Sequence, residues 1–432
     1  MHAARRIAVV GGGWAGMAAA VELAARGMQV AVFEAGKLLG GRARRVEVDG
    51  AIFDNGLHIL VGAYRETLRL IAMVRQPGGT DGLLRLPIQL RVEPGFALSA
   101  PRLPAPLHLA VALATASGLS LSGRIAAIRF MLAQRLRRFR CDPSLTVSEL
   151  LARHAQPQPL IDFLWGPLCI AALNTLPREA SAQVFLAVLR DSLASTRAAS
   201  DLLLPTVDFS ALFPEPARRF VEERGGSVQT AAPVKAVHLR GNDFEIESPQ
   251  GGTFSDVVLA TDPHRACELL EPLPATAALI ARLRKFAYRP IYSIYLQYPD
   301  GVRLPGPMVG FRDGIAQWAF DRGQLCNQPG LIAVVISASG AHQQLPHQEL
   351  AHAVHTELAQ WLPGLPVPLR HQVIAEKRAT FACVPQLDRP GNRTPLPRLY
   401  LAGDYTDSEY PATLEAAVRS GVACARLIAR NG

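Results

Sequence analysis

The chain has 432 residues, of which 49% are hydrophobic and 19% charged, enough for a large core and two domains. Its formal net charge of +9 favours anionic partners, but no nucleic-acid motif or lysine-rich tail accompanies this charge, so we expect no nucleic-acid ligand. The six cysteines are scattered without a C-x-x-C pair, which argues against a metal site and a disulfide framework and fits a reducing cytoplasm.

The first stretch of the chain predicts a nucleotide-binding unit. An apolar strand over Ile7–Val10 leads into Gly11, Gly13 and Gly16, and a helix over Ala15–Arg26 follows. At this spacing the first glycine allows a tight turn, the second lets the backbone approach a pyrophosphate, and the third lets the helix pack on the strand. The N-terminus of the helix then directs free N–H groups at the phosphates.

A second apolar strand ends in Glu34, about 20 residues beyond the glycines, where an acidic side chain binds ribose hydroxyls. Three spaced glycines alone are weak evidence. Because strand, helix, second strand and acid are all in place, the stretch predicts dinucleotide binding and not a glycine-rich surface turn.

Two further segments distinguish between dinucleotides. Gly40-Gly41-Arg42-Ala43 follows the acid almost at once and resembles the second pyrophosphate contact of the FAD-dependent amine oxidase and carotenoid desaturase superfamily. Near the other end of the chain, Leu399–Asp404 and Pro411–Ala417 resemble the C-terminal flavin motif of that superfamily. The resemblance implies an α/β fold, in which a Rossmann-type FAD-binding domain of the GR2-like flavoprotein kind is combined with a discontinuous α+β substrate domain.

We expect the FAD-binding domain to comprise residues 1–75, 225–285 and 390–432, and the substrate domain residues 76–224 and 286–389. Short strands with turns at Gly241 and Gly251 follow residue 225, and the superfamily places the residue at Val234 against adenine. The FAD contacts predicted by motif and resemblance are Gly11, Gly13, Ala15, Gly16, Glu34, Ala35, Gly41, Arg42, Gly56, Leu57, His58, Val234, Gly403, Asp404, Thr413 and Leu414.

Three blocks suggest a narrower family. DNGLHILVGAY (Asp54–Tyr64), LWGPLCIAALNT (Leu164–Thr175) and PATLEAAVRSG (Pro411–Gly421) together resemble the hydroxysqualene dehydroxylases of bacterial hopanoid synthesis. The middle block is the family-specific one, and the other two are shared across the superfamily. This resemblance implies an FAD-dependent oxidoreductase that removes the hydroxyl of hydroxysqualene to give squalene, by hydride transfer from reduced FAD to an allylic cation. The electron donor that reduces the FAD is not named by the sequence.

Other functions stay open. A carotenoid or phytoene-type desaturase would use the same fold and a similar isoprenoid substrate, with the flavin run in the opposite direction. A non-catalytic flavoprotein that escorts a lipid would also keep the cofactor motifs. An amine oxidase fits less well, because those enzymes place an aromatic residue just before the Leu-Glu-Ala sequence, where this chain has Thr413.

Candidate catalytic residues are His58, Asp407 and Tyr410, since the dehydroxylation needs a proton donor for a poor leaving group. Each also has a structural interpretation, as a histidine bonded to backbone or as part of a solvated loop. Asn174 and Asp191 are polar groups in apolar helical surroundings, and each could orient a hydroxyl or cap a neighbouring element.

The segment Arg124–Arg140 predicts a basic amphipathic helix, which can lie in a membrane interface or pack on the core with a solvated basic face. We therefore expect a cytoplasmic protein, peripheral on the inner face of the cytoplasmic membrane through anionic lipid. The preceding apolar stretch, Pro104–Ser122, falls short of the roughly 20 residues needed to span a bilayer. The expected apolar face is Ile125, Ile128, Met131, Leu132, Leu136 and Phe139, and the expected basic face is Arg124, Arg129, Arg135, Arg137, Arg138 and Arg140.

Overall fold

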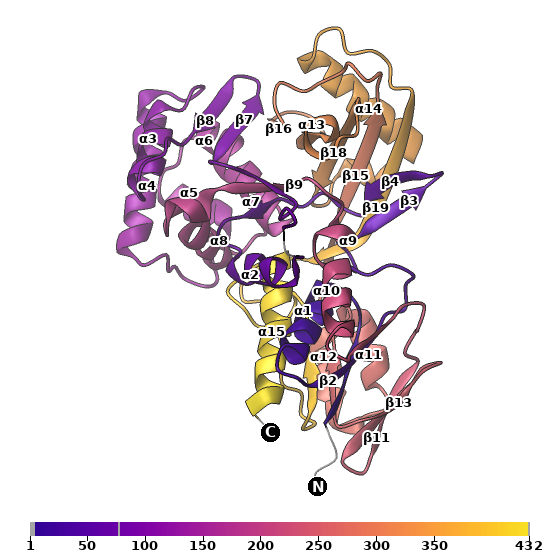
Figure 1. The fold of residues 1–432 in the computed structure, drawn as a ribbon. Coiled ribbons are helices and arrows are strands. Elements are labelled where there is room, and N and C mark those ends of the chain that lie inside the picture. Colours follow the sequence, from indigo (N-terminus) through magenta and orange to yellow (C-terminus); the bar gives the residue numbers. More distant parts are fainter. Residues whose placement is uncertain (1–4, 77, 431–432) are drawn as a thin grey trace.

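A computed structural model describes residues 5–76 and 78–430 (Figure 1). A five-stranded parallel sheet in the lower half of the molecule has the strand order β10-β2-β1-β14-β20. This sheet confirms the predicted Rossmann-type domain, because the first strand pairs with β2 and β14, and β14 pairs in turn with β20 from near the end of the chain. Its strands are β1 (Arg6–Val10), β2 (Gln29–Phe33), β10 (Ser227–Gln229), β14 (Asp256–Leu259) and β20 (Leu399–Leu401).

Helices cover this sheet, and a small separate antiparallel sheet packs against it. The long helices α1 (Trp14–Ala24) and α15 (Leu414–Arg430) pack on each other so closely that a Cβ at Gly421 would lie 2.1 Å from the Ala15 carbonyl oxygen. The remaining elements are the sheet of β11 (Ala236–Arg240), β12 (Asp243–Glu247) and β13 (Gly252–Phe254), and the helices α2 (Arg65–Val74), α11 (Pro263–Leu270) and α12 (Ala277–Leu283).

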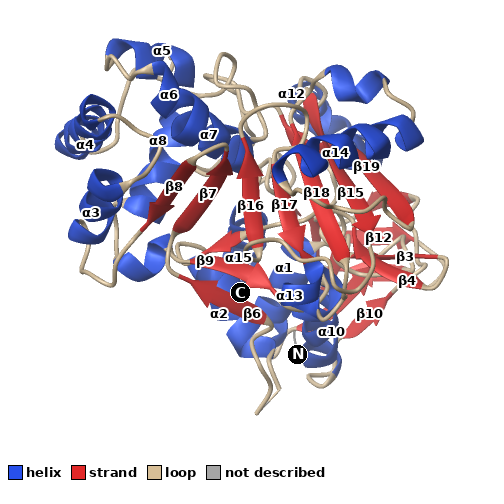
Figure 2. Ribbon diagram, turned by 90° about the horizontal axis from the view of Figure 1, so that it is seen from above, coloured by secondary structure: helices blue, strands red, loops and turns tan. Residues whose placement is uncertain are grey.

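The second domain is built on a seven-stranded sheet of the order β19-β15-β18-β17-β16-β7-β8, which Figure 2 shows from above. Helix α14 (His347–Trp361) packs against β15 and β19, and an apolar cluster fills the space between the helix and the sheet. The strands are β7 (Gln89–Glu93), β8 (Phe96–Ser99), β15 (Tyr288–Gln297), β16 (Met308–Phe311), β17 (Trp318–Asp321), β18 (Leu331–Ser337) and β19 (Arg370–Phe381).

A helical lobe lies beside this sheet, at the left edge in Figures 1 and 2. Thr146 is the N-cap of one of its helices, in a capping box with Glu149. The family-specific block Leu164–Thr175 begins in a π-helical turn, Ile161–Trp165, and continues as α7. The helices are α3 (Leu107–Thr115), α4 (Leu121–Leu136), α5 (Val147–Arg153), α6 (Gln158–Leu160), α7 (Gly166–Leu173) and α8 (Ala182–Val188), with a second π turn at Leu189–Leu193.

Short elements connect the domains. They are the hairpin of β3 (Arg45–Val48) and β4 (Ala51–Asp54), the small sheet of β5 (Leu60–Val61), β9 (Leu202–Pro205) and β6 (Leu83–Leu86), and the helices α9 (Phe209–Leu212), α10 (Pro214–Glu222) and α13 (Arg322–Cys326).

The structure moves one expected domain boundary. We placed residues 76–224 together in the substrate domain, but α9 and α10 pack in the core of the nucleotide domain. Trp14 of α1 lies 5.1 Å from Phe213 between ring centroids, and Ala217 and Val221 of α10 are fully buried in the same cluster. The chain thus returns to the nucleotide domain at Phe209, before β10.

The expected apolar face of the Arg124–Arg140 segment is wrong in part. Its helix, α4, buries Ala127, Phe130 and Gln134, whereas Leu132 and Leu136 are 55% and 86% exposed. Phe130 fixes this orientation because its ring packs on Trp165 at 5.2 Å. None of the helices in residues 5–76 and 78–430 is long and apolar enough to cross a membrane.

Candidate functional site

The glycine turn between β1 and α1 needs its glycines for different reasons. Gly11 has a φ of +110°, and a Cβ there would lie 2.6 Å from the Ala260 carbonyl oxygen. A Cβ at Gly16 would lie 1.9 Å from the Gly11 carbonyl oxygen, so only glycine lets the helix start this close to the strand. At Gly13 the nearest atom to a Cβ is Gly41 Cα at 3.8 Å. The backbone at Gly13 is therefore accessible on the side that faces Gly41.

The N-terminus of α1 has the character of an anion-binding site. Its N-cap, Gly13, makes no side-chain hydrogen bond, and no acidic residue lies in the first turn. The first backbone N–H groups of the helix, including that of Ala15, therefore have no capping side chain. Together with the helix dipole, these groups favour a negatively charged ligand.

Glu34 lies at the end of β2, beside the glycine turn. Its carboxylate accepts hydrogen bonds from the N–H groups of Gly12 and Gly36, each at 2.7 Å. The exposed Ala35 follows it, and the loop after β10 donates a backbone N–H to the Glu34 carbonyl oxygen at 2.8 Å. Val234 of that loop is buried. The residues predicted on the ribose and adenine side thus lie at one edge of the sheet, with the carboxylate fixed by backbone.

The second half of the site joins the two ends of the chain. Gly41, with a φ of +60°, turns the backbone beside Gly13, and Arg42 follows. The Arg42 guanidinium donates to the Asp404 carboxylate at 2.7 Å and to the Ala379 carbonyl oxygen at 2.6 Å. Arg42 and Asp404 are 362 residues apart in sequence, so the two predicted flavin motifs meet in space.

These groups fit a dinucleotide. The glycine backbone at Gly13 and Gly41 leaves room that a Cβ would occupy, and the N-terminus of α1 and Arg42 supply donors for phosphate oxygens. Glu34 supplies a carboxylate where ribose hydroxyls would bind. The donor set is therefore complete for a pyrophosphate with its ribose.

The match to a family model identifies the cofactor. The model described as flavin containing amine oxidoreductase matches residues 14–429. This chain belongs to that family. It is an FAD-dependent oxidoreductase, and the FAD cofactor predicted from the motifs is confirmed.

Individual relatives support the same assignment. A hydroxysqualene dehydroxylase from Rhodopseudomonas palustris is 29% identical over 99% of this chain and 99% of its own. A 15-cis-phytoene desaturase from an Oncidium hybrid cultivar is 25% identical over 98% of this chain and 78% of its own. An oxidoreductase from Methanosarcina mazei superposes with a TM-score of 0.77 at 15% identity, over 98% of this chain and 100% of that one, which shows the fold. The resemblance predicted from the three sequence blocks is thereby confirmed.

In this flavin-containing amine oxidoreductase an arginine holds the C-terminal loop in which flavin contacts were predicted. Arg389 donates to the carbonyl oxygens of Asp404 and Tyr410 at 2.6 and 2.7 Å, and to that of Ser408 at 2.9 Å. Sequence analysis missed Arg389, because a loop arginine that bonds only to backbone belongs to no motif. Its contacts fix the shape of the loop on which Gly403 and Asp404 are presented.

The helix that follows is positioned by two side chains. Thr413 caps α15, since its Oγ1 accepts the Ala416 N–H at 3.2 Å, and Leu414 begins the helix. Glu415 is fully buried and accepts the N–H and the hydroxyl of Thr67 at 2.9 and 2.8 Å. The Glu415 carboxylate therefore caps the N-terminus of α2, a structural role that the sequence did not indicate.

His58 is half-buried and lies near Arg42. Its ring packs edge-on against Phe209, with the centroids 5.1 Å apart. Gly56, with a φ of +147°, and the half-buried Leu57 precede it. Burial, and then the charge of Arg42, lower the pKa of His58 to about 4. At neutral pH the imidazole is uncharged, which suits a hydrogen-bonding role better than proton donation by an imidazolium.

Tyr410 belongs to a partly buried polar network. Its hydroxyl donates to the Asp191 carboxylate at 2.6 Å, and Arg190 bonds to that carboxylate at 2.7 Å. Burial raises the pKa of Asp191, but the hydrogen bonds from Arg190 and Tyr410 outweigh it, so the pKa lies below its ordinary value. Burial and the neighbouring Asp191 raise the pKa of Tyr410. The network thus combines a protonated phenol with an ionised carboxylate.

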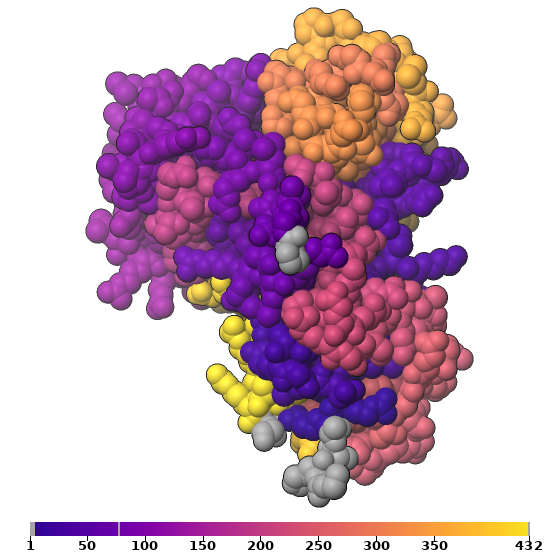
Figure 3. Space-filling model, viewed as in Figure 1, coloured from indigo at the N-terminus to yellow at the C-terminus, as the bar shows by residue number. Residues whose placement is uncertain are grey.

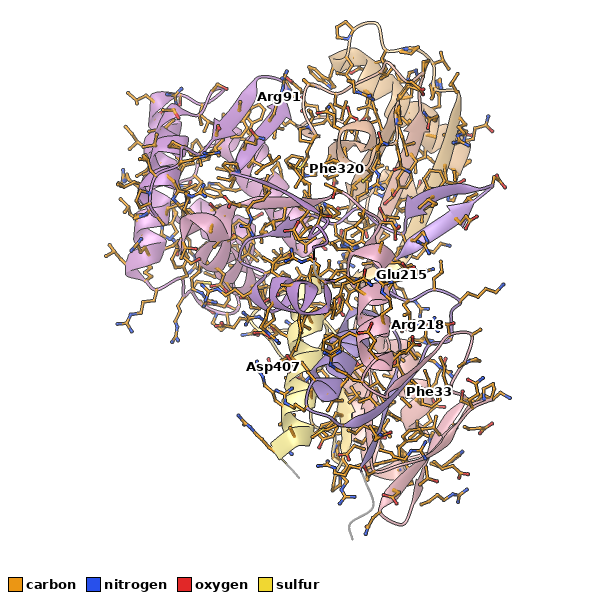
Figure 4. All side chains as sticks on the ribbon, in the orientation of Figure 1. Phe33, Arg91, Glu215, Arg218, Phe320 and Asp407 are labelled. Carbon is orange, nitrogen blue, oxygen red and sulfur yellow. The ribbon has the colours of Figure 1, made fainter. Side chains whose placement is uncertain are left out.

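The other polar candidates differ from this pair. Asp407 is exposed, and Figure 4 labels it beside α15. Asn174 ends α7 in the left-handed conformation, and its side-chain amide donates to Thr380 at 2.9 Å and to the Pro290 carbonyl oxygen at 3.2 Å. Asn174 therefore joins α7 to the second domain's sheet. This is a structural role, of the kind considered for Asn174 as the alternative to orienting a hydroxyl.

Proposed function

We propose that this enzyme removes the hydroxyl of hydroxysqualene to give squalene, with FAD as its redox cofactor. The observation that carries the proposal is the end-to-end similarity to the Rhodopseudomonas palustris hydroxysqualene dehydroxylase, which covers 99% of both chains. The desaturase relative, in contrast, extends beyond the region that this chain covers, since only 78% of its length is matched.

The reaction sets three requirements. The carbon–oxygen bond of the allylic alcohol breaks, the oxygen leaves as water after gaining a proton, and the carbon gains a hydride. Reduced FAD supplies that hydride when bound. The protein must bind an apolar chain, hold a proton close to the hydroxyl, and exclude water that would recapture the allylic cation.

Half-buried aliphatic side chains support the binding of an apolar chain. Leu168 and Ala172 lie one turn apart on α7, and Val184 and Val188 lie one turn apart on α8. All four pack against the main apolar cluster. Asp191 follows one turn after Val188. The row of aliphatic side chains therefore ends beside the carboxylate that accepts the Tyr410 hydroxyl. We assign these side chains to the walls of the isoprenoid site.

Tyr410 is the residue proposed to contact the substrate hydroxyl. Its phenol carries a proton at neutral pH, and its backbone belongs to the loop that Arg389 ties to Asp404. Asp191 is proposed as a positioning residue, because it accepts the phenolic hydrogen in the free enzyme and fixes the orientation of the ring; that hydrogen would turn from Asp191 to the substrate hydroxyl when the substrate binds. His58 and Asp407 remain predicted candidates that the geometry favours less.

Removing the phenolic hydroxyl tests this assignment. We expect Tyr410→Phe to lower kcat about 100-fold or more with KM little changed, because general acid–base groups contribute about that factor. Asp191→Asn should lower kcat less and alter its pH profile, since it acts through Tyr410. Squalene formed from hydroxysqualene by reduced enzyme is measured by chromatography, together with the FAD content of each variant.

The matched control is Tyr298→Phe. Tyr298 is also buried and also shares its hydroxyl with a polar partner, His355 at 3.1 Å, but it lies between the sheet and α14. Its loss should leave turnover unchanged. Normal kcat in Tyr410→Phe would remove Tyr410 from the mechanism, and a loss of FAD in that variant would make its role structural.

The main alternative is a desaturase of the carotenoid or phytoene type, which the 25% identity to the Oncidium enzyme supports. It would take hydrogens from a polyene precursor and transfer the electrons to oxidised FAD. A non-catalytic lipid escort would give no product with either substrate. The proposed function also includes peripheral association with an anionic membrane, where a long isoprenoid resides, and an electron donor that is still to be identified.

A further inference from the structure

Helices α3 and α4 expose an apolar surface on the outer edge of the helical lobe. In Figures 1 and 2 both helices lie at the left margin of the molecule, and the space-filling view in Figure 3 has the same region at its left margin. We call this surface the α3–α4 face. Its residues are Leu103, Leu107 and Val111, which are 38%, 56% and 36% exposed, and Leu121, Ile125, Leu132 and Leu136, which are 72%, 48%, 55% and 86% exposed.

The apolar residues of α4 form a continuous stripe. Leu121, Ile125, Leu132 and Leu136 recur at helical spacing, so they share one side of the helix. The opposite side, with Phe130 at its centre, is buried in the lobe. The other exposed large apolar residues of the described chain lie elsewhere, singly at Ile52, Met73 and Leu239 and as a pair in one loop at Val367 and Leu369. The α3–α4 face is thus a local concentration of apolar surface.

The segment that carries this face has charges of a single sign. Residues 94–141 contain no aspartate or glutamate. Within residues 5–76 and 78–430, none of the arginines in that stretch forms an ion pair, although Arg218 of α10 and many other arginines pair with acids. The unpaired arginines are Arg102, Arg124, Arg129, Arg135, Arg137, Arg138 and Arg140.

We propose that the α3–α4 face docks on the surface of an anionic lipid bilayer. The leucines would enter the headgroup–acyl boundary, and the flanking arginines would bind lipid phosphates, as interfacial amphipathic helices do. A second copy of this chain fits the face poorly, because two such surfaces would bring like charges together. The inference deepens the membrane association included in the proposed function and rests on that part alone.

Vesicle flotation of the FAD-loaded enzyme tests the proposal without any substrate. We expect binding to phosphatidylcholine vesicles that contain phosphatidylglycerol, weak binding to pure phosphatidylcholine, and a loss of binding with salt. Arg135→Gln, Arg137→Gln and Arg138→Gln together should weaken binding to the anionic vesicles about 100-fold, because each arginine near such a surface contributes about fivefold.

Leu132→Glu with Leu136→Glu should also release the enzyme. The matched control is Val367→Glu with Leu369→Glu, two side chains that are 76% and 71% exposed outside the face and should leave vesicle binding unchanged. Equal binding of all variants, or equal binding to neutral vesicles, would overturn the proposal. So would a dimer of the wild type that the Leu132 and Leu136 changes dissociate. Squalene formation in detergent is measured separately, so failure of the docking face and failure of the reaction are distinguishable.

Discussion

Gly13→Glu is expected to give a folded, colourless protein. A Cβ at Gly13 meets no atom closer than 3.8 Å, so the chain tolerates a side chain there, but the new carboxylate would lie at the N-terminus of α1. Like charges at the pyrophosphate site cost several kcal/mol, which corresponds to a loss of FAD affinity of about 100-fold or more. The ratio of flavin to protein absorbance measures the loss, and circular dichroism reports the fold.

Gly301→Glu is the control, because a Cβ at Gly301 has no neighbour within 4 Å and the residue lies in an exposed turn away from the motifs. It should stay yellow. Gly16→Ala provides a contrast, since its Cβ would lie 1.9 Å from the Gly11 carbonyl oxygen and the turn itself must shift. A Gly13→Glu protein that keeps its full complement of FAD would contradict the site described here.

Asp54→Ala is expected to destabilise the fold by about 3–5 kcal/mol, because it leaves a buried arginine without its acidic partner. Asp54 of β4 and Arg322 of α13 form an ion pair at 3.1 Å, with side chains 0% and 4% exposed. The carboxylate also accepts the Phe209 N–H at 2.9 Å, and Tyr295 donates its hydroxyl to the Asp54 carbonyl oxygen at 2.8 Å. These contacts join the nucleotide domain to the second sheet. Denaturant unfolding measures the change.

The control for this ion pair is Arg218→Ala. Arg218, labelled in Figure 4, pairs with Glu222 on the exposed side of α10, with both side chains about two-fifths exposed, so its loss should cost less than about 1 kcal/mol. Replacing both buried partners, as in Asp54→Leu with Arg322→Met, should recover most of the stability lost by the single change. Equal small effects of Asp54→Ala and Arg218→Ala would show that the buried pair does not hold the domains.

The same carboxylate predicts a pH dependence. Burial is the largest effect on Asp54 and raises its pKa from 3.8 to about 6, against the attraction of Arg322. The folded state therefore binds the proton more tightly than the unfolded state. The contribution of this group to stability is fully present below pH 3.8 and is lost as the pH rises through about 6. Asp54→Asn should flatten that part of the curve of unfolding free energy against pH.

Local motifs made the nucleotide site predictable. The turn at Gly11 to Gly16 and the acid at Glu34 depend on residues close in sequence, and their spacing carries the geometry. The meeting of Arg42 with Asp404 could be predicted only through family resemblance, because nothing local relates residues 362 positions apart. Arg389 and Glu415 could not be found either way, since each bonds to backbone groups brought close by folding.

The prediction of which side of α4 is buried was wrong in part for a different reason. Apolar residues occur on both sides of this helix, so periodicity alone could not decide which side is buried. The tertiary contact of Phe130 with Trp165 decides it and leaves Leu132 and Leu136 outside. The expected domain boundary before β10 was misplaced for a similar reason. The helix at Pro214–Glu222 packs on Trp14 through Phe213, and periodicity does not reveal such a contact between distant parts of the chain.

The central claim concerns the direction of electron flow, and one anaerobic experiment tests it. The FAD of the purified enzyme is reduced with dithionite, the excess is removed, and hydroxysqualene is added in detergent while the flavin spectrum is followed. The account predicts that the oxidised spectrum returns and that one squalene forms for each FAD. A flavin that stays reduced with hydroxysqualene, together with oxidised enzyme that a polyene precursor reduces, would contradict the dehydroxylase and establish a desaturase.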